Sequence, residues 1–314
     1  MPEKTPPGDG VLTPDEAFAR LGNETRVEIL RVLGSAAEPL GFSELYDRTD
    51  VPDSGQFNYH LGKLAGQFVR KTEEGYTLRR TGRRVVEAVL SGAVTERQEL
   101  DRTRIDEPCE YCGAPIEVAW SEGSVRLFCT ECAGQYGRAH EGVTTSVDAR
   151  DGYLGRLPLP PAGVRDRSPA EMLPAARLSG TMDVYALSEG ICPRCSATVE
   201  RTVSVCEDHA AGETLCGECQ SRYATKVGFE CTNCIYEGGG AGGIALVTDD
   251  ALVEFLVDHG YNPVAADSTS PVNRVHQNYE EDVRSTDPLR VEFTFHVDGD
   301  SLSLTADENL DVIE

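Results

Sequence analysis

Cysteine content limits the folds open to this chain more than any other feature of its sequence. Seven of the eleven cysteines lie between Cys192 and Cys234, and His209 lies among them. Ligands this dense are typical of a disulfide framework, a redox centre or a metal-binding module. The start, MPEKTPPGDG, lacks the basic and apolar regions of a signal peptide, and no apolar run is long enough to cross a bilayer, so we expect a cytoplasmic chain without membrane contact. A reducing compartment favours metal ligands over disulfides.

The first cysteine cluster has the spacing of a zinc ribbon. Cys109 and Cys112 form one CxxC pair, and Cys129 and Cys132 form a second pair after sixteen intervening residues. The segment between the pairs, PIEVAWSEGSVRLF, favours strands, so a hairpin would return the chain and bring four thiolates around one ion. We therefore predict a zinc ribbon over residues 105–140.

The second cluster, residues 191–236, reads as a variation on the same unit. CEYCGAPIEVAW is similar to CPRCSATVERTV, and FCTECAGQY is similar to LCGECQSRY. This repeat favours an interleaved pairing, in which Cys192/Cys195 share a site with Cys216/Cys219, and Cys206/His209 share a site with Cys231/Cys234. Sequential pairing, with Cys192, Cys195, Cys206 and His209 in one site and the last four cysteines in the other, stays open. Either way, up to three structural Zn²⁺ ions are expected on twelve ligands: Cys109, Cys112, Cys129, Cys132, Cys192, Cys195, Cys206, His209, Cys216, Cys219, Cys231 and Cys234.

Redox or catalytic use of these cysteines is less favoured by the sequence. A thioredoxin-like CxxC pair follows a strand in a βαβ unit, and no such unit is evident here. A catalytic zinc keeps one coordination position open, whereas each predicted site is filled by four protein ligands. We expect no enzymatic activity and identify no small-molecule substrate. The remaining histidines have no ligand spacing and are expected to be unliganded: His60, His140, His259, His276 and His296.

The first third of the chain, residues 13–95 after a disordered N-terminus over 1–12, has the signals of a small helical domain. Thr13-Pro14-Asp15-Glu16 is a capping box that begins a helix, and further helices are predicted from Glu24 to Gly34, over 42–50 and over 53–63. In the fourth helix Phe57, Leu61 and Leu64 form one buried face. Two short strands around residues 73–75 and a helix over 83–94 complete a winged helix-turn-helix.

This segment resembles the ArsR-type transcription regulators, through LGNETRVEILRVL (21–33), NYHLGKL (58–64) and VRKTEEGYTL (69–78). The resemblance implies that residues 53–63 form a recognition helix in the major groove of double-stranded DNA, and that the protein is a homodimer, since two-fold operators match paired recognition helices. Base contacts are expected from Ser54, Gln56, Asn58, Tyr59 and Lys63. Phosphate contacts are expected from Arg70, Lys71, Arg79 and Arg80.

Charge agrees with this assignment only locally. The chain carries a net charge of −24, which repels nucleic acid, and residues 243–314 contain 16 Asp/Glu against three Arg. Between His60 and Arg84, however, seven Lys/Arg face two Glu, a net charge of +5. The competing hypothesis is a protein-interaction scaffold in which the winged helix and the zinc ribbons bind proteins and DNA binding has been lost.

Two segments link and follow the cysteine clusters. Residues 141–190 are expected to form a proline-rich connector with a short helix near 169–178, and EGGGAGG (237–243) a hinge. Residues 243–314 predict an acidic α+β segment, with a helix from Thr248 to His259 and a hairpin at Asp298-Gly299. With its cysteine clusters this tail resembles ArsR-like regulators of halophilic archaea. The prediction is thus an α+β, zinc-stabilised transcriptional regulator whose C-terminal region senses, dimerises or recruits.

Overall fold

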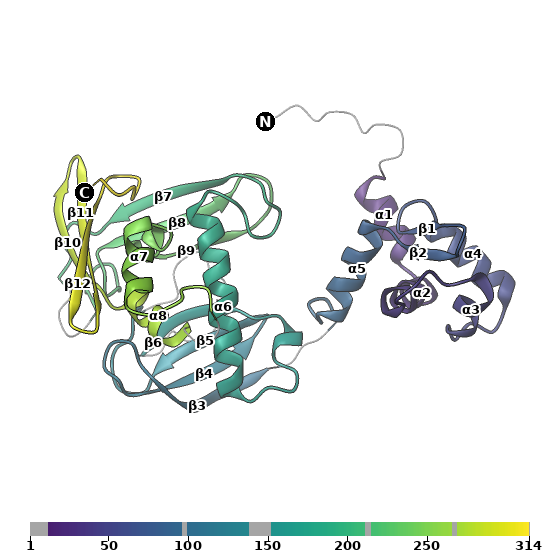
Figure 1. The fold of residues 1–314 in the computed structure, drawn as a ribbon, viewed down its shortest axis with the longest axis horizontal. Helices are drawn as coiled ribbons and strands as arrows, with labels where there is room; N and C mark the ends of the chain where they lie inside the picture. The colour runs from purple at the N-terminus through teal and green to yellow at the C-terminus, as the bar shows by residue number, and fades with distance from the viewer. Residues whose placement is uncertain (1–11, 96–98, 138–151, 211–214, 266–268, 314) are drawn as a thin grey trace. The chain divides into compact units, whose positions relative to one another are not determined.

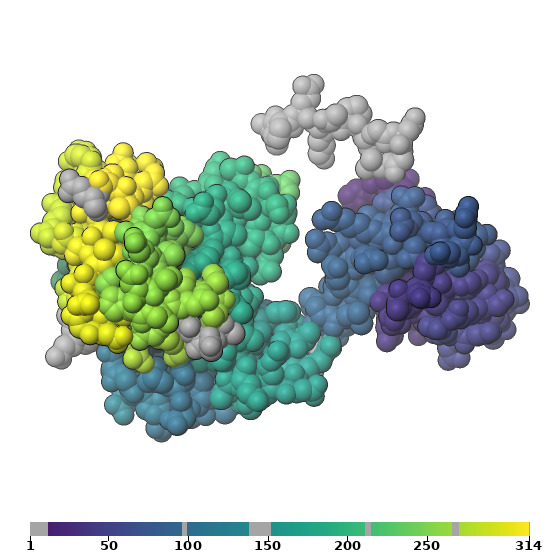
Figure 2. All heavy atoms as spheres, viewed as in Figure 1, coloured from purple at the N-terminus to yellow at the C-terminus, as the bar shows by residue number. Residues whose placement is uncertain are grey.

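A computed structural model describes residues 12–95, 99–137, 152–210, 215–265 and 269–313. The chain folds into two compact units, Met1–Glu96 and Arg97–Glu314 (Figures 1 and 2). Together they form a mixed α+β protein. Within the described residues, no helix has the length and apolar character needed to span a membrane. The predicted disorder of residues 1–12 concerns a segment that, apart from Leu12, lies outside the described residues.

The first unit contains five helices and one hairpin within its described residues: α1 (Pro14–Leu21), α2 (Glu24–Ser35), α3 (Phe42–Asp47), α4 (Ser54–Leu64), β1 (Val69–Lys71), β2 (Tyr76–Leu78) and α5 (Arg80–Leu90). The capping box at Thr13 is confirmed, since its side chain accepts from the amide of Glu16 and the Glu16 carboxylate accepts from Thr13. The predicted buried face of α4 is also confirmed (Phe57, Leu61, Leu64).

The last helix of this unit is displaced from the prediction of residues 83–94. It begins at Arg80, because Arg79 already has an extended backbone and acts as the N-cap residue. Gly82 is buried in its first turn, where a Cβ atom would lie only 2.3 Å from the carbonyl oxygen of Phe68. The first turn of α5 therefore packs closely on the backbone of Phe68, just before β1. Hydrophobic periodicity does not reveal this contact, so it did not predict the start of the helix.

The second unit begins with a four-stranded antiparallel sheet: β3 (Leu100–Pro108), β4 (Pro115–Ser121), β5 (Ser124–Cys129) and β6 (Tyr153–Pro158), in that spatial order. The predicted hairpin between the first two CxxC pairs is β4–β5. Residues 153–158, assigned to the connector by the sequence, instead pair with β5 as an edge strand. Residues 138–151, which include His140, lie outside the described residues.

The short helix expected near 169–178 is in fact α6 (Pro169–Ser188), twenty residues long and preceded by the 3₁₀ turn η1 (Pro161–Gly163). Pro174 lies inside it, and an interior proline normally costs about 3 kcal/mol. Burial of Met172, Leu173 and Ala176 offsets that cost, because this side of α6 covers the first sheet. Tertiary contact therefore extends a helix that the local sequence would end.

The second sheet is formed by β7 (Val199–Val205), β8 (Thr225–Cys231) and β9 (Glu237–Ala241), all antiparallel. The hinge predicted over 237–243 is wrong, because this stretch is β9 followed by the buried 3₁₀ helix η2 (Gly242–Leu246). Its glycines permit close packing: a Cβ on Gly243 would lie 2.5 Å from the ring of Tyr279, and Gly239 has a φ of 155°.

The C-terminal elements are α7 (Asp250–Asp258), α8 (Thr269–Gln277), β10 (Glu280–Thr286), β11 (Leu289–Val297) and β12 (Asp300–Ala306). The hairpin at Asp298-Gly299 is confirmed, and both turn residues have positive φ. The helix predicted from Thr248 is instead capped by Asp249, whose carboxylate accepts from Ala251 and Leu252.

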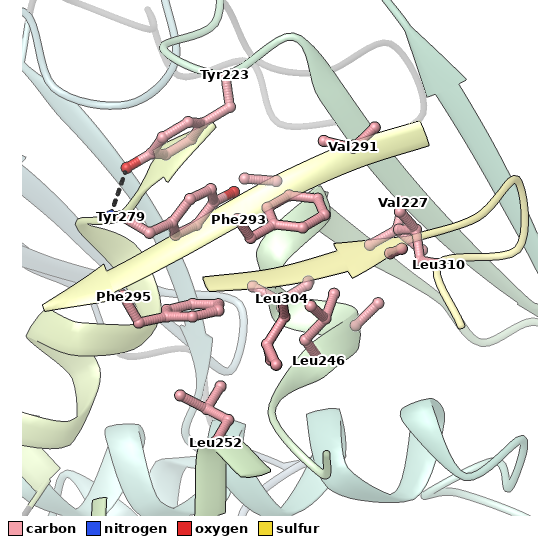
Figure 3. Close-up of a cluster of buried hydrophobic side chains, with 14 of the residues drawn as sticks. Tyr223, Val227, Leu246, Leu252, Tyr279, Val291, Phe293, Phe295, Leu304 and Leu310 are labelled. Atoms are coloured by element: carbon pink, nitrogen blue, oxygen red, sulfur yellow. Dashed lines mark hydrogen bonds between the residues drawn. The ribbon is translucent and has the colours of Figure 1, made fainter. Parts of the chain in front are cut away.

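One core joins these C-terminal elements to the second sheet. Figure 3 shows Val227 of β8, Leu246 of η2 and Phe293 of β11 in the same cluster, with Tyr279 stacked on Tyr223 at a centroid distance of 4.1 Å. The segments predicted as separate modules, 191–236 and 243–314, therefore share one hydrophobic interior.

Candidate functional site

The twelve predicted metal ligands lie in three groups of four within the second unit. The groups are Cys109, Cys112, Cys129 and Cys132 (site 1); Cys192, Cys195, Cys231 and Cys234 (site 2); and Cys206, His209, Cys216 and Cys219 (site 3). In each group the ligand atoms all lie within 4.8 Å of one another, and the eleven cysteines are free thiols.

The distances fit a tetrahedral ion better than disulfides. Cys109 and Cys132 place their sulfurs 3.7 Å apart, and Cys112 and Cys129 place theirs 3.5 Å apart. Site 2 repeats these values, 3.7 Å between Cys192 and Cys234 and 3.5 Å between Cys195 and Cys231. Zinc bound to thiolates at about 2.3 Å would set tetrahedral edges of about 3.8 Å, whereas a disulfide needs about 2.05 Å.

The pairing of sites 2 and 3 corrects both sequence-based alternatives. It is neither interleaved nor sequential but nested: the first CxxC pair joins the last, and the two middle pairs join each other. The cause is strand register. Val199 pairs with Cys231 across β7–β8, as Ile116 pairs with Cys129 across β4–β5. Each hairpin therefore brings the CxxC turn that follows it back to the CxxC turn that precedes it. We call such a turn, or its CxxH equivalent, a knuckle.

Site 3 is an insertion at the far end of the second hairpin. In the first sheet, β4 and β5 are joined by a tight turn at Glu122-Gly123, whereas β7 and β8 are joined by residues 206–224, which carry all four ligands of site 3. The backbone amide of Cys206 donates to the carbonyl of Ala224 and closes the insertion. The similarity of LCGECQSRY to FCTECAGQY led to the wrong predicted pairing. It compares Cys216/Cys219, which belong to the insertion, with Cys129/Cys132, which complete site 1.

His209 is oriented as a ligand through Nδ1. Its Nδ1 lies 3.4 Å from the sulfur of Cys219, and its Nε2 lies 3.1 Å from the carbonyl oxygen of Arg222. An Nε2–H group donating to that carbonyl leaves the Nδ1 lone pair free for a metal ion, a common outer-shell arrangement around zinc. Sequence spacing identified His209 but carried no signal for its partner, because any residue supplies a backbone carbonyl.

Backbone amides favour the thiolate at one cysteine of each site, while burial raises the pKa of other cysteines there, such as Cys132 and Cys206. The amides of Cys234 and Asn233 lower the pKa of Cys231 to about 6. Those of Cys219 and Ala210 lower the pKa of Cys216 to about 6. In site 1 the amides of Glu131 and Cys132 donate to the sulfur of Cys129. These donors stabilise the charged form that binds metal. Donor chemistry, distances and thiolate stabilisation thus all fit a closed four-coordinate ion.

Sites 1 and 3 are connected through one arginine. The guanidinium of Arg222 lies 4.1 Å from the ring centroid of Tyr111 and donates to the carbonyl of Gly134. Tyr111 lies between Cys109 and Cys112 in the sequence. The backbones after the two CxxC pairs also bond to each other, from Gly137 to Gln220 and from Arg222 to Gln135. Arg222 is a functional candidate that the sequence analysis missed, since a lone arginine near cysteines has no distinctive spacing.

Outside the three groups, the described histidines have structural surroundings. His60 is buried in α4, and desolvation lowers its pKa. Nδ1–H of His259 donates to the carbonyl of Phe255, and Nε2 lies 3.2 Å from the carboxylate of Asp300. The hydrogen bond to Phe255 and then the one to Asp300 raise the pKa of His259. His276 is buried in α8. His296 lies 3.4 Å from Glu280.

The predicted DNA-contacting residues all lie exposed on the first unit. Ser54, Gln56, Asn58, Tyr59 and Lys63 occupy the outer faces of α4, opposite its buried apolar face. Asp53 caps this helix by accepting from the amide of Gln56. The amine of Lys63 lies 5.3 Å from the ring centroid of Tyr59, so the two side chains share one surface.

The basic residues after α4 line a hollow of about 550 Å³. Four arginines contribute to it: Arg70, Arg79, Arg80 and Arg83. It lies at the start of α5, where Arg79 is the N-cap residue and makes no side-chain capping bond. Amides of a helix N-terminus surrounded by guanidinium groups form a favourable environment for phosphate. Lys71, which is exposed on β1, lies near the ring of Tyr76 instead.

Together, fold and ligand groups define a mixed α+β protein with three cysteine-rich candidate metal centres. The chain belongs to the family described as domain of unknown function DUF7351, whose model matches residues 106–312. A second model, domain of unknown function DUF7347, matches residues 14–89. No curated protein and no solved structure matches the chain. The two matched ranges correspond closely to the two structural units.

Proposed function

We propose that this chain is a DNA-binding transcriptional regulator whose first unit is a winged helix-turn-helix of ArsR-like type. The observation that carries the proposal is the four-arginine hollow at the start of α5, next in the chain to the hairpin that follows the exposed polar helix α4. In a chain with a net charge of −24, clustered cations in one hollow favour a phosphate-bearing partner.

In this proposal α4 enters the major groove of double-stranded DNA. Its exposed side chains, Gln56, Asn58 and Lys63 among them, carry donors and acceptors suited to base edges. The hairpin β1–β2 is the wing, and Arg70, Arg79 and Arg80 contact phosphates beside the groove. The unit works as a homodimer, to which the exposed apolar side chains of Phe18 and Val94 offer surface.

The second unit acts as a metal-stabilised regulatory region. Up to three Zn²⁺ ions bound at sites 1, 2 and 3 would tie the ends of both hairpins together and add metal-binding free energy to folding. Each site has four protein ligands and no open position, which supports a structural and not a catalytic role. The unit senses a ligand, dimerises or recruits a partner, and the protein has no enzymatic activity.

The proposal is tested by electrophoretic mobility shift at high salt, with promoter fragments from the organism and the double variant R79E/R80E. We expect a specific fragment to be bound, and the variant to bind it at least about tenfold more weakly with a salt slope reduced by about 2. The matched control is R31E/R48E, which changes the charge of the same unit equally at exposed positions outside the hollow. Equal losses in both variants would indicate only a net-charge effect. If no fragment is bound more tightly than bulk DNA, the regulator proposal fails and the scaffold hypothesis replaces it.

A further inference from the structure

A second cavity lies within the second unit and borders site 2 through Arg194, which lies between Cys192 and Cys195. It is a cleft of about 630 Å³ between α6, the edge strand β6, the β7–β8–β9 sheet and α8. This volume lies in the range of pockets that bind small organic molecules. In Figure 1, α6 runs alongside both sheets, so a single helix forms one long wall of the cleft.

The floor of the cleft is part of the β7–β8–β9 sheet. Gly228 of β8 pairs directly with Gly239 of β9, and both line the cleft. Thr202 of β7 pairs with Gly228, and its hydroxyl oxygen lies over Gly228, 2.6 Å from where a Cβ atom would be. The floor therefore has no side chain at its two glycines and one hydroxyl group beside them.

Apolar residues line two adjacent parts of the wall. Gly180 and Val184 on α6 line one side, and Leu157 and Pro158 of β6 line the adjacent part. Gly180 permits this arrangement, since a Cβ there would lie 3.0 Å from Leu157. A ligand in this space would lose apolar surface to protein on its sides as well as its floor.

Three buried polar groups at the cleft have no hydrogen-bond partner among the described residues. They are Nε of Arg177, the hydroxyl of Tyr185 and Nε2 of His276. Arg177 is 3% exposed and His276 is 6% exposed. A buried polar group without a partner costs about 1–3 kcal/mol, and folded proteins retain few of them. Three in one cleft point to a partner outside the described side chains, either ordered water or a ligand.

His276 presents a neutral imidazole to this space. Desolvation lowers its pKa to about 4, so at neutral pH it offers one donor and one acceptor. Asn273, three residues before His276, shares its face of α8, and Gln277 also lines the cleft. Polar side chains of α8 and, from α6, those of Arg177 and Tyr185 therefore border the cleft.

The charges of the lining are opposite to those of the unit. Residues 97–314 contain 17 Lys/Arg against 38 Asp/Glu. The cleft is lined by four cations, Arg156, Arg177, Arg194 and Lys226, and by two carboxylates, Asp183 and Glu237. Arg177 is neutralised by Glu107 and Glu110, and Arg194 by Asp183, while Lys226 donates to the carbonyl of Cys219. Arg156 is exposed and has no ion pair in the described part of the chain. An exposed arginine without a carboxylate partner, in a unit of net negative charge, favours an anionic group on the ligand.

We propose that this cleft binds a small planar molecule with an apolar ring system and one anionic group, such as a carboxylate. The rings lie over the sheet floor beside Thr202, the anionic group approaches Arg156, and ring substituents meet Tyr185 and His276. That this molecule is the effector of a regulator rests on the proposed function. That the cleft binds it does not, because binding is tested below by a titration without DNA.

The test uses the full metal-loaded chain and two matched probes, 2-naphthoate and the uncharged 2-naphthamide, titrated by calorimetry up to about 1 mM. We expect saturable one-to-one binding of 2-naphthoate, and binding of the amide about tenfold weaker. Arg156→Gln should weaken 2-naphthoate about tenfold and leave the amide unchanged. No saturable binding of either probe would overturn the site, and equal affinities would overturn its preference for an anion.

Two substitutions on neighbouring positions of α6 locate the binding. Thr181→Trp places an indole in the cleft and should abolish binding, whereas Met182→Trp alters an exposed position that does not line it and should leave binding unchanged. Unchanged circular dichroism and metal content show that both variants are folded. If both variants bind 2-naphthoate equally well, the ligand lies elsewhere and the proposal is wrong.

Discussion

The buried ion pairs of Arg177 allow a sharp prediction of stability. Arg177 is 3% exposed and bonds to Glu107 and to Glu110, the latter 5% exposed and 3.0 Å away. Glu110 lies between Cys109 and Cys112, so this arginine of α6 fixes the first knuckle of site 1. Arg177→Met leaves the buried carboxylate of Glu110 without its cation and removes one of the cations beside the partly buried Glu107, which costs about 3–5 kcal/mol.

The same change at an exposed arginine should cost far less. Arg284 bonds to Asp282 and Glu292 at 2.9 and 2.7 Å, but its side chain is 55% exposed. Arg284→Met is therefore expected to change the free energy of unfolding very little. In thermal unfolding of the metal-loaded chain, Arg177→Met should lower the midpoint of the second unit by on the order of 10 °C, against a few degrees for Arg284→Met.

The destabilisation by Arg177→Met should also depend on pH. Burial raises the pKa of Glu107, but hydrogen bonds from Arg177 and Ser270 outweigh burial and lower it overall. Without Arg177 the remaining burial favours the protonated acid, so the cost is largest at neutral pH and shrinks as the pH falls toward about 5. Arg177→Met/Glu110→Gln should recover part of the loss at neutral pH. Equal costs for Arg177→Met and Arg284→Met, or no recovery in the double variant, would refute this reasoning.

Three further predictions concern the metal centres, the glycines of η2 and the buried histidine. Mass spectrometry under native conditions should find three zinc ions per chain. Cys195→Ser/Cys231→Ser changes one site and should lose one ion, whereas Cys195→Ser/Cys206→Ser changes two sites and should lose two ions. The reverse result would contradict the nested pairing. Gly243→Ala should lower the free energy of chemical unfolding by about 1–3 kcal/mol, because the new Cβ atom meets the stacked ring of Tyr279. Gly217→Ala, where no atom lies within 4 Å of the new Cβ, should lower it less. Equal losses would show that the ring of Tyr279 moves aside. The pKa of His276 falls from 6.5 to about 4 on folding, because burial disfavours the protonated imidazole, so the unit loses about 3 kcal/mol of stability as the pH falls from about 6.5 to about 4. His276→Gln should reduce the acid sensitivity of the unfolding free energy by that amount, and an unchanged pH dependence would show that His276 does not titrate.

The sequence predicted the local elements well because their causes are local. The capping boxes at Thr13 and Ser168 lie within four residues, and each is present in the structure. The alternation of Val291, Phe293 and Phe295 likewise reports a buried strand face directly. All twelve candidate ligands could be identified from spacing, since a CxxC turn brings its own two sulfurs together.

The features that the sequence did not predict depend on distant contacts. Which CxxC pairs meet is decided by the register of β7 and β8, and the repeat of residue types pointed to the wrong partner. The glycines at 237–243 resemble a hinge in composition, but they are required by the close approach of β8 and Tyr279. The length of α6 and the strand β6 depend on packing between segments far apart in the chain.

The central claim, that the first unit reads DNA, is tested most directly by selection from the organism's own sheared genomic DNA. The purified full chain is mixed with the fragments at high salt, and the bound fraction is sequenced. The account predicts enrichment of a small set of fragments that share two related half-sites about 10 base pairs apart, or a multiple of that spacing, as expected for a dimer. The same selection with R79E/R80E should return no enrichment. A bound fraction from the wild-type chain with the sequence composition of the input DNA would contradict the account.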